Sequence, residues 1–191
     1  MHRPSSVLGL LLCGCVLLLA TVHAGIKVKT DYNKAFDFKK PQTWAWNDTG
    51  AGKVIMARTA DDRPDEVRER AEPVIKDAVA AELARKKLQP ATTGAPDLKV
   101  TYHLLITVGN SAQTMGQFAP AEWGLLPFTG ATQALRSFDQ GSLVLDITAN
   151  DQMVWRGAAQ AEIKPDLTVE KRHQLIREAV RELFSRYPPR K

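Results

Sequence analysis

Alternating apolar and polar positions predict strands in several parts of the chain. The clearest run extends from Leu98 to Val108, where every even position is apolar and most odd positions are polar. Because side chains alternate between the two faces of a strand, this segment is predicted to be a strand with one wholly apolar face. Shorter alternating runs at 26–29 and 43–46 predict two more strands.

Two longer apolar segments, 143–148 and 153–158, predict a hairpin around the connection 149–152. If the large apolar residues at odd positions of both segments share one face, odd residues must oppose odd residues. A two-residue loop forbids that pairing and a three-residue loop allows it. Asp146 and Arg156 would then be direct or diagonal neighbours on the opposite face, where a cross-strand pair contributes about 0.2–1 kcal/mol.

Two further segments have apolar residues at helical spacing. The first lies between Pro64 and Leu88, with Pro73 either opening the main helix at its first turn or kinking a longer one. The second extends from Val169 to Tyr187 and ends at two prolines. The order of strands and helices predicts an α+β fold, a two-layer α/β sandwich with a mostly antiparallel sheet and two helices packed on one face.

Several single residues have structural interpretations within this fold. Trp44, Trp46 and Trp155 are large apolar side chains at strand positions, so we expect them in the core, with partners for their indole N–H groups. Gly157 is expected where a side chain would obstruct the helix packed above the sheet. Asp97, which follows a proline, is expected to form a turn or a hydrogen bond at the start of a strand.

Residues 1–24 have the pattern of a signal peptide. A positive start precedes an apolar segment over 7–20, and Ala24 ends a small-residue cleavage pattern. Cleavage there would leave 25–191 as a single periplasmic or secreted domain. In the alternative, Cys15 is acylated and the protein is an outer-membrane lipoprotein. The apolar run continues past Cys15, which favours soluble export.

Composition and charge narrow the classes of partner. The chain has 191 residues, 44% of them hydrophobic, and a net charge of +5, which is typical of a globular protein. Removal of 1–24 takes away Arg3 and leaves a net charge of +4, all of it in 25–58, which holds seven basic residues against three acidic ones. This segment could attract an anionic lipid headgroup or polysaccharide, although a solvated surface is the simpler interpretation. Nucleic acid is not expected as a partner, because export separates the chain from it.

No motif of a catalytic, metal-binding or cofactor-binding site stands out. Both cysteines lie within 1–24, and only His103 and His173 lie beyond it, so we expect no metal and no cofactor. His103 is expected to be solvated on the polar face of its strand, and His173 to be packed on the apolar face of the last helix. The enzyme alternative is a hydrolase-like site of His103, Asp146 and Arg156, which would have to converge in a cleft with a nucleophile.

The segment 109–140 departs from the rest of the chain, with three charged residues and four aromatic ones in thirty-two positions. One interpretation is a long docking loop that presents Phe118, Trp123 and Phe128 to an envelope protein or a lipid. The other is a flap whose aromatic side chains cover the exposed end of the core. A third possibility, an amphiphile carrier, would need an apolar cavity lined by Trp123 and Phe128.

Several segments together resemble one bacterial family, domain of unknown function 4136 (DUF4136). They are 28–38, the Thr-Trp-Ala-Trp sequence at 43–46, 96–102, 141–146 with 154–158, and the Tyr-Pro-Pro sequence at 187–189. Their order and spacing cover nearly all of 25–191. The resemblance implies a two-layer α/β sandwich and a secreted or lipid-anchored envelope protein with no known reaction.

These observations lead to one functional hypothesis, with the enzyme and carrier alternatives beside it. The protein is interpreted as an exported cell-envelope protein, a non-enzymatic accessory or binding module that presents 109–140 to a partner. Attachment to a membrane is expected only if Cys15 is acylated. The sequence leaves the oligomeric state open.

Overall fold

The elements of the fold follow the predicted periodicities. The computed structural model describes residues 25–47, 53–57, 63–107, 113–114, 136–137, 140–164 and 166–189. The strands are β1 (Lys27–Tyr32), β2 (Thr43–Trp46), β3 (Lys53–Ala57), β4 (Gln89–Pro90), β5 (Leu98–Thr107), β6 (Gln113–Thr114), β7 (Arg136–Ser137), β8 (Gln140–Ala149) and β9 (Gln152–Glu162). The helices are α1 (Pro64–Arg85) and α3 (Val169–Ser185). Every strand and helix predicted from the sequence is present.

The main sheet has the strand order β1-β9-β8-β5-β2-β4, and β3 also pairs with β5. The pairs β1–β9, β9–β8 and β8–β5 are antiparallel, whereas β2 and β3 are parallel to β5, and β4 is parallel to β2. The long strands are therefore antiparallel, as predicted, and the short strands make the sheet mixed. Parallel pairing of β3 with β5 requires a crossover connection, which α1 supplies. Separately, β6 and β7 pair with each other.

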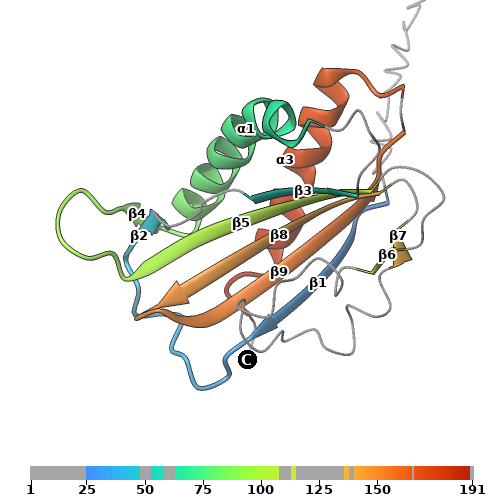
Figure 1. The fold of residues 1–191 in the computed structure, drawn as a ribbon. Coiled ribbons are helices and arrows are strands. Elements are labelled where there is room, and N and C mark those ends of the chain that lie inside the picture. Colours follow the sequence, from blue (N-terminus) through green and yellow to red (C-terminus); the bar gives the residue numbers. More distant parts are fainter. Residues whose placement is uncertain are drawn as a thin grey trace, which may run out of the picture.

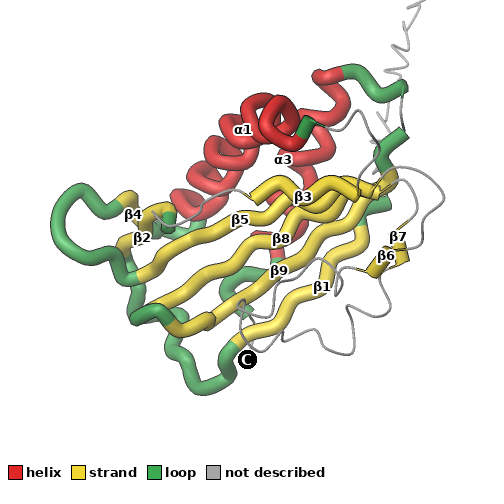
Figure 2. The backbone as a smooth tube through the Cα atoms, in the orientation of Figure 1, coloured by secondary structure: helices red, strands yellow, loops and turns green. Residues whose placement is uncertain are grey.

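Both helices lie on one face of the sheet, as predicted (Figures 1 and 2). Gly157 in β9 marks a close approach of α3 to the sheet. A Cβ atom placed on it would lie 2.7 Å from Cδ2 of Leu183 in α3 and 2.4 Å from Cη2 of Trp155. Real Cβ atoms do not come so near, so the predicted role of Gly157 in helix packing is confirmed.

The two helices begin and end where their sequences favour it. α1 starts at Pro64, a residue suited to the first turn of a helix, and continues through Pro73 as one long helix. It ends before Lys87, whose φ of 66° is left-handed and stops the helical path. α3 is capped by Thr168, whose hydroxyl oxygen accepts a hydrogen bond from the backbone N–H of Lys171 at 3.3 Å.

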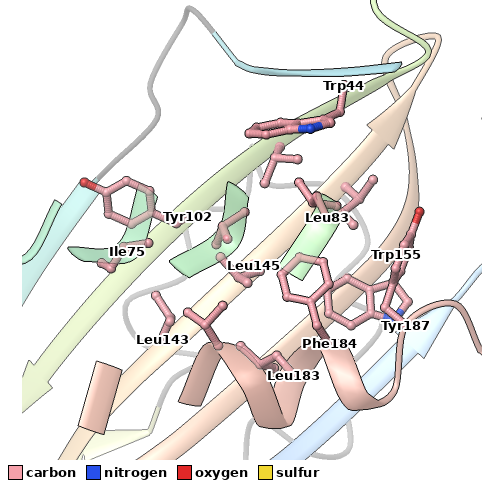
Figure 3. Packing of buried hydrophobic residues seen from close by; sticks show 14 of the residues in the cluster. Trp44, Ile75, Leu83, Tyr102, Leu143, Leu145, Trp155, Leu183, Phe184 and Tyr187 are labelled. Atoms are coloured by element: carbon pink, nitrogen blue, oxygen red, sulfur yellow. The ribbon is translucent and has the colours of Figure 1, made fainter. Parts of the chain in front are cut away.

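The core lies between the helices and the sheet (Figure 3). Its largest fully buried side chains are Trp155, Tyr102 and Phe184, which come from β9, β5 and α3. Trp44 is buried and Trp46 is partly buried against the same cluster, as expected. For Trp44 and Trp155 the expected partners of the indole groups are not found, because their N–H groups have no hydrogen-bond partner in the described part of the chain.

The β8–β9 turn corrects the predicted loop length. The loop consists of Asn150 and Asp151 alone, whose φ angles of 50° and 58° are the left-handed pair that a tight type I′ turn requires. A register shift between Ile147 and Thr148 then places Ile147 opposite Trp155. The predicted odd-to-odd pairing is confirmed from Ile147 and Trp155 inward, where a bulge rather than a longer loop produces it, but it is wrong for Met153, which lies opposite Thr148.

Candidate functional site

The sheet face that points away from the helices carries a row of polar side chains at its centre. Because Gly157 faces α3, its neighbour Arg156 points to the opposite face. Arg156 pairs directly with Asp146 in β8, and Asp146 pairs with Thr101 in β5. On its other side Arg156 pairs with Asp31 in β1. Four strands thus contribute one residue each to the same row.

The centre of this face is buried. Arg156 is 2% exposed, Asp146 6% and His103 9%, and the neighbouring polar residues Ser142 and Gln160 are equally enclosed at 2% and 6%. The prediction that His103 is solvated was therefore wrong. Alternation in a strand distinguishes the two faces of a sheet, but it does not show that the polar face is open to water. His173 is partly buried on α3.

Asp146 and Arg156 form a bidentate ion pair. Nε of Arg156 donates to Oδ1 of Asp146 at 2.5 Å, and Nη2 donates to Oδ2 at 2.6 Å. This planar, doubly bonded arrangement is the strongest geometry available to an arginine and a carboxylate. The imidazole of His103 lies beside the pair, with Nε2 3.6 Å from Oδ2 of Asp146.

The surroundings of Asp146 keep it ionised. Burial by itself raises the pKa of this carboxyl, but the hydrogen bonds from Arg156, and then the nearby imidazole of His103, outweigh burial and hold the pKa below its usual value. A carboxylate with a lowered pKa and both oxygens bonded to a guanidinium is a poor proton acceptor. Asp146 is therefore suited to a permanent ion pair with Arg156 and not to the transfer of protons.

The structure brings together the three residues named in the enzyme alternative. His103 comes from β5, Asp146 from β8 and Arg156 from β9, and the strand register places them side by side. Sequence reasoning had paired Asp146 with Arg156 but had missed Ser142 and Gln160 as buried polar neighbours. The signal for these two was their position on the same alternating face as Asp146 and Arg156. Nε2 of Gln160 has no hydrogen-bond partner within the described ranges.

A second polar contact is formed where β2 and β5 begin. Oδ2 of Asp97 accepts hydrogen bonds from the backbone N–H groups of Gln42 and Thr43 and from the Thr43 hydroxyl, each at 2.9 Å. The two backbone donors contribute most to lowering the pKa of Asp97, followed by the hydroxyl. The predicted hydrogen bond at a strand start is confirmed, and its role is structural.

The other predicted site residues lie outside the described residues. These are Cys15 in the expected signal peptide and Phe118, Trp123 and Phe128 in the segment 109–140. Within the described ranges, no three histidine, cysteine, aspartate or glutamate side chains gather where they could hold a metal ion. Neither of the described helices is long and apolar enough to cross a membrane.

Comparison with solved structures gives weak likenesses over most of the chain. A PDZ domain protein from Parabacteroides distasonis ATCC 8503 matches with a TM-score of 0.51 and 15% identity over 87% of this chain, which spans only 37% of that protein. Two PelC dodecamer structures from Paraburkholderia phytofirmans, one of them a variant, match with TM-scores of 0.41 and 0.42 and identities of 9% and 7%. Each of these two matches covers 87% of this chain and 99% of the PelC chain. The first likeness shows the fold alone.

The family comparison is more extensive. No curated protein matches this chain. A family model described as "Domain of unknown function (DUF4136)" matches residues 28–189, from the second residue of β1 to the prolines beyond α3. The match includes every strand and helix that builds the core, in agreement with the resemblance noted from the sequence. The chain therefore belongs to the DUF4136 family.

Proposed function

We propose that this protein is an exported accessory or binding module of the cell envelope and not an enzyme. The observation that carries this proposal is the buried ion pair of Asp146 and Arg156. The charged groups that most resemble catalytic machinery satisfy each other and are closed off from solvent. A catalytic base needs access to its substrate and a pKa near the working pH, and Asp146 has neither.

Export is supported by the sequence before the domain. The apolar segment at 7–20 and the cleavage pattern ending at Ala24 precede β1 by only a few residues. The cysteines both lie in this segment, so the domain that follows has no thiol to oxidise outside the cytoplasm.

The intact mass of the protein recovered from the native envelope fraction tests export. A mass that begins at Gly25 identifies a periplasmic or secreted domain. A mass that begins at Cys15 and includes acyl chains identifies a lipoprotein. Recovery of the complete chain from the cytoplasm, with Met1 retained, would contradict the proposal.

A complementation experiment tests the non-enzymatic role. We expect a His103→Gln variant, which keeps an N–H group near Asp146 but cannot transfer protons, to restore a deletion strain as fully as the unmodified protein. Protein level and thermal unfolding are measured in parallel, and a His173→Gln variant on α3 is the matched control. A His103→Gln protein that is folded and present at the normal level, yet fails where His173→Gln succeeds, would favour the enzyme alternative.

A further inference from the structure

One edge of the sheet, together with the loop beside it, carries five exposed lysines. Lys27 and Lys29 lie on β1, and Lys34, Lys39 and Lys40 lie on the loop that follows it. All five side chains are exposed, and none forms an ion pair with a residue in the described part of the chain. Residues 25–47 hold these five lysines and two aspartates, which gives a local net charge of +3. We call the surface formed by the five lysines the lysine edge.

The surface of α1 shows the opposite arrangement. Each basic residue of α1, and Arg63 just before it, pairs with an acidic residue three or four positions away. Examples are Arg63 with Glu66 at 2.7 Å and Lys76 with Glu72 at 2.5 Å. The four basic and six acidic residues of α1 leave this helix with a net charge of −2. The positive charges of α1 are thus paired with acidic neighbours, whereas those of the lysine edge are not paired with any described residue.

The loop that bears three of the lysines has a defined conformation. Phe36 and Phe38 contact each other edge to face with ring centroids 4.9 Å apart, and Phe38 contacts Tyr187 at 5.8 Å. The side chain of Asp37 accepts a hydrogen bond from the backbone N–H of Lys39 at 3.1 Å. Because aromatic side chains anchor the loop to the core, its lysines are held on the outside.

We propose that the lysine edge binds the anionic phospholipid headgroups of a membrane surface. The described surface lacks the apolar centre that a protein interface normally has, since Val169 on α3 is the only large hydrophobic residue that is exposed among the described residues. A row of separate positive charges instead suits many separate phosphates. The lysine edge also begins within a few residues of the apolar segment at 7–20, which places it beside the membrane during export or after acylation. This inference rests on the envelope location proposed above.

Vesicle sedimentation tests the proposal with the protein as recovered from the envelope fraction. The readout is the ratio of binding to vesicles of phosphatidylcholine mixed with phosphatidylglycerol and binding to phosphatidylcholine alone, which corrects for any acyl chain. We expect a variant with Lys34→Gln, Lys39→Gln and Lys40→Gln to lose about a hundredfold in this ratio, because each lysine near an anionic surface contributes about fivefold. Replacing the same three lysines with arginine should preserve binding.

A matched variant on α1 separates local from total charge. Arg68→Gln, Arg70→Gln and Arg85→Gln also remove three positive charges, and we expect them to change the ratio by no more than about twofold, because they lie on a surface that is already acidic. Equal losses in the two variants would overturn the proposal, as would equal binding to the two kinds of vesicle. Competition by a soluble sulfated polysaccharide as strong as that by the vesicles would also overturn it. These outcomes are independent of the intact mass that tests export.

Discussion

The two faces of the sheet are both buried at their centres, but they are held by different interactions. The face toward the helices is apolar, with Leu145 and Ile147 of β8 packed under the helices beside Trp155. The opposite face, one residue away along the same strands, holds Asp146 and Arg156. Truncating a side chain in an apolar core lowers the stability of the protein in proportion to the atoms removed. Removing one partner of a buried ion pair costs more than the pair contributed, because it leaves the other charge buried and unpaired.

Removal of one member of the ion pair should therefore have the largest effect. We expect Asp146→Ala to lower the free energy of unfolding by about 3–5 kcal/mol, because it leaves the Arg156 guanidinium buried without a counter-charge. The double variant Asp146→Leu with Arg156→Met should recover most of that loss, since two apolar side chains replace the two charges. Urea unfolding of the single and double variants measures both values. A single variant within about 1 kcal/mol of the unmodified protein would mean that the pair does not hold this face together.

Acid should weaken the same face without any substitution. The pKa of Asp146 is lower in the folded protein than its value of about 3.9 in an unfolded chain, so its contribution is complete above that value and is lost as the pH falls through the folded pKa. The loss should be smaller than for Asp146→Ala, because a protonated carboxyl still accepts a hydrogen bond. The measurement is the free energy of unfolding at a series of pH values that spans roughly two units either side of the unfolded pKa. Its slope against pH gives the acid sensitivity.

The double variant is also the control for the acid experiment. Without Asp146 the slope of stability against pH should decrease, while the part due to Asp97, whose pKa is lowered by hydrogen bonds, should remain. An unchanged slope would assign the acid sensitivity to other carboxyls.

On the apolar face, a single added methyl group should have an intermediate effect. Gly157→Ala places a Cβ atom 2.4 Å from Trp155 and 2.7 Å from Leu183, so α3 or the tryptophan must shift. We expect a loss of about 1–3 kcal/mol, measured by urea unfolding. Gly25→Ala is the matched control, because nothing lies within 4 Å of a Cβ atom there. If both variants were equally stable, α3 would not be as close to the sheet as the structure has it.

Periodicity was enough to predict the apolar face, but not the state of the opposite face. The alternation in 98–108 identifies which side chains share a face, and the helices must cover the apolar one. The same alternation is compatible with a polar face that is wet or buried, so His103 was expected in solvent. What the sequence lacked was the strand order, because Asp146 and Arg156 oppose each other on two strands that both have neighbours on either side. Unlike charges in the middle of a sheet are more enclosed than those at its edge.

Two local features escaped prediction for the same reason, because they do not follow a regular period. β3 contains the run Val54-Ile55-Met56, which is too short and too uniformly apolar to show alternation. The β8–β9 loop was expected to have three residues because the parity argument assumed a regular ladder. A bulge inserts one extra residue into one strand, so that odd residues can oppose odd residues even when the loop is a two-residue turn.

A substitution in the β8–β9 turn should have the smallest effect on the free energy of unfolding. Asp151 adopts a φ of 58°, which costs a residue with a side chain about 1–2 kcal/mol relative to glycine, and it also forms an exposed ion pair with Lys99 at 2.9 Å. We expect Asp151→Gly to raise the free energy of unfolding by about 1 kcal/mol or less, because relief of the backbone outweighs a pair that contributes about 0.2–1 kcal/mol.

The variant Lys99→Gln removes the same ion pair without changing the turn. We expect Lys99→Gln to lower the free energy of unfolding slightly. We expect Asp151→Gly to leave the register of β8 with β9 unaltered, so that apolar and charged residues stay on opposite faces of the sheet. Thermal unfolding of both variants measures the difference, and amide hydrogen exchange along β9 reports the register. If Asp151→Gly lowered stability as much as Lys99→Gln, the ion pair rather than the left-handed backbone would dominate the turn. Glycine is compatible with the left-handed backbone at this position and aspartate only tolerates it, so we expect the gain from the backbone to exceed the loss of the pair.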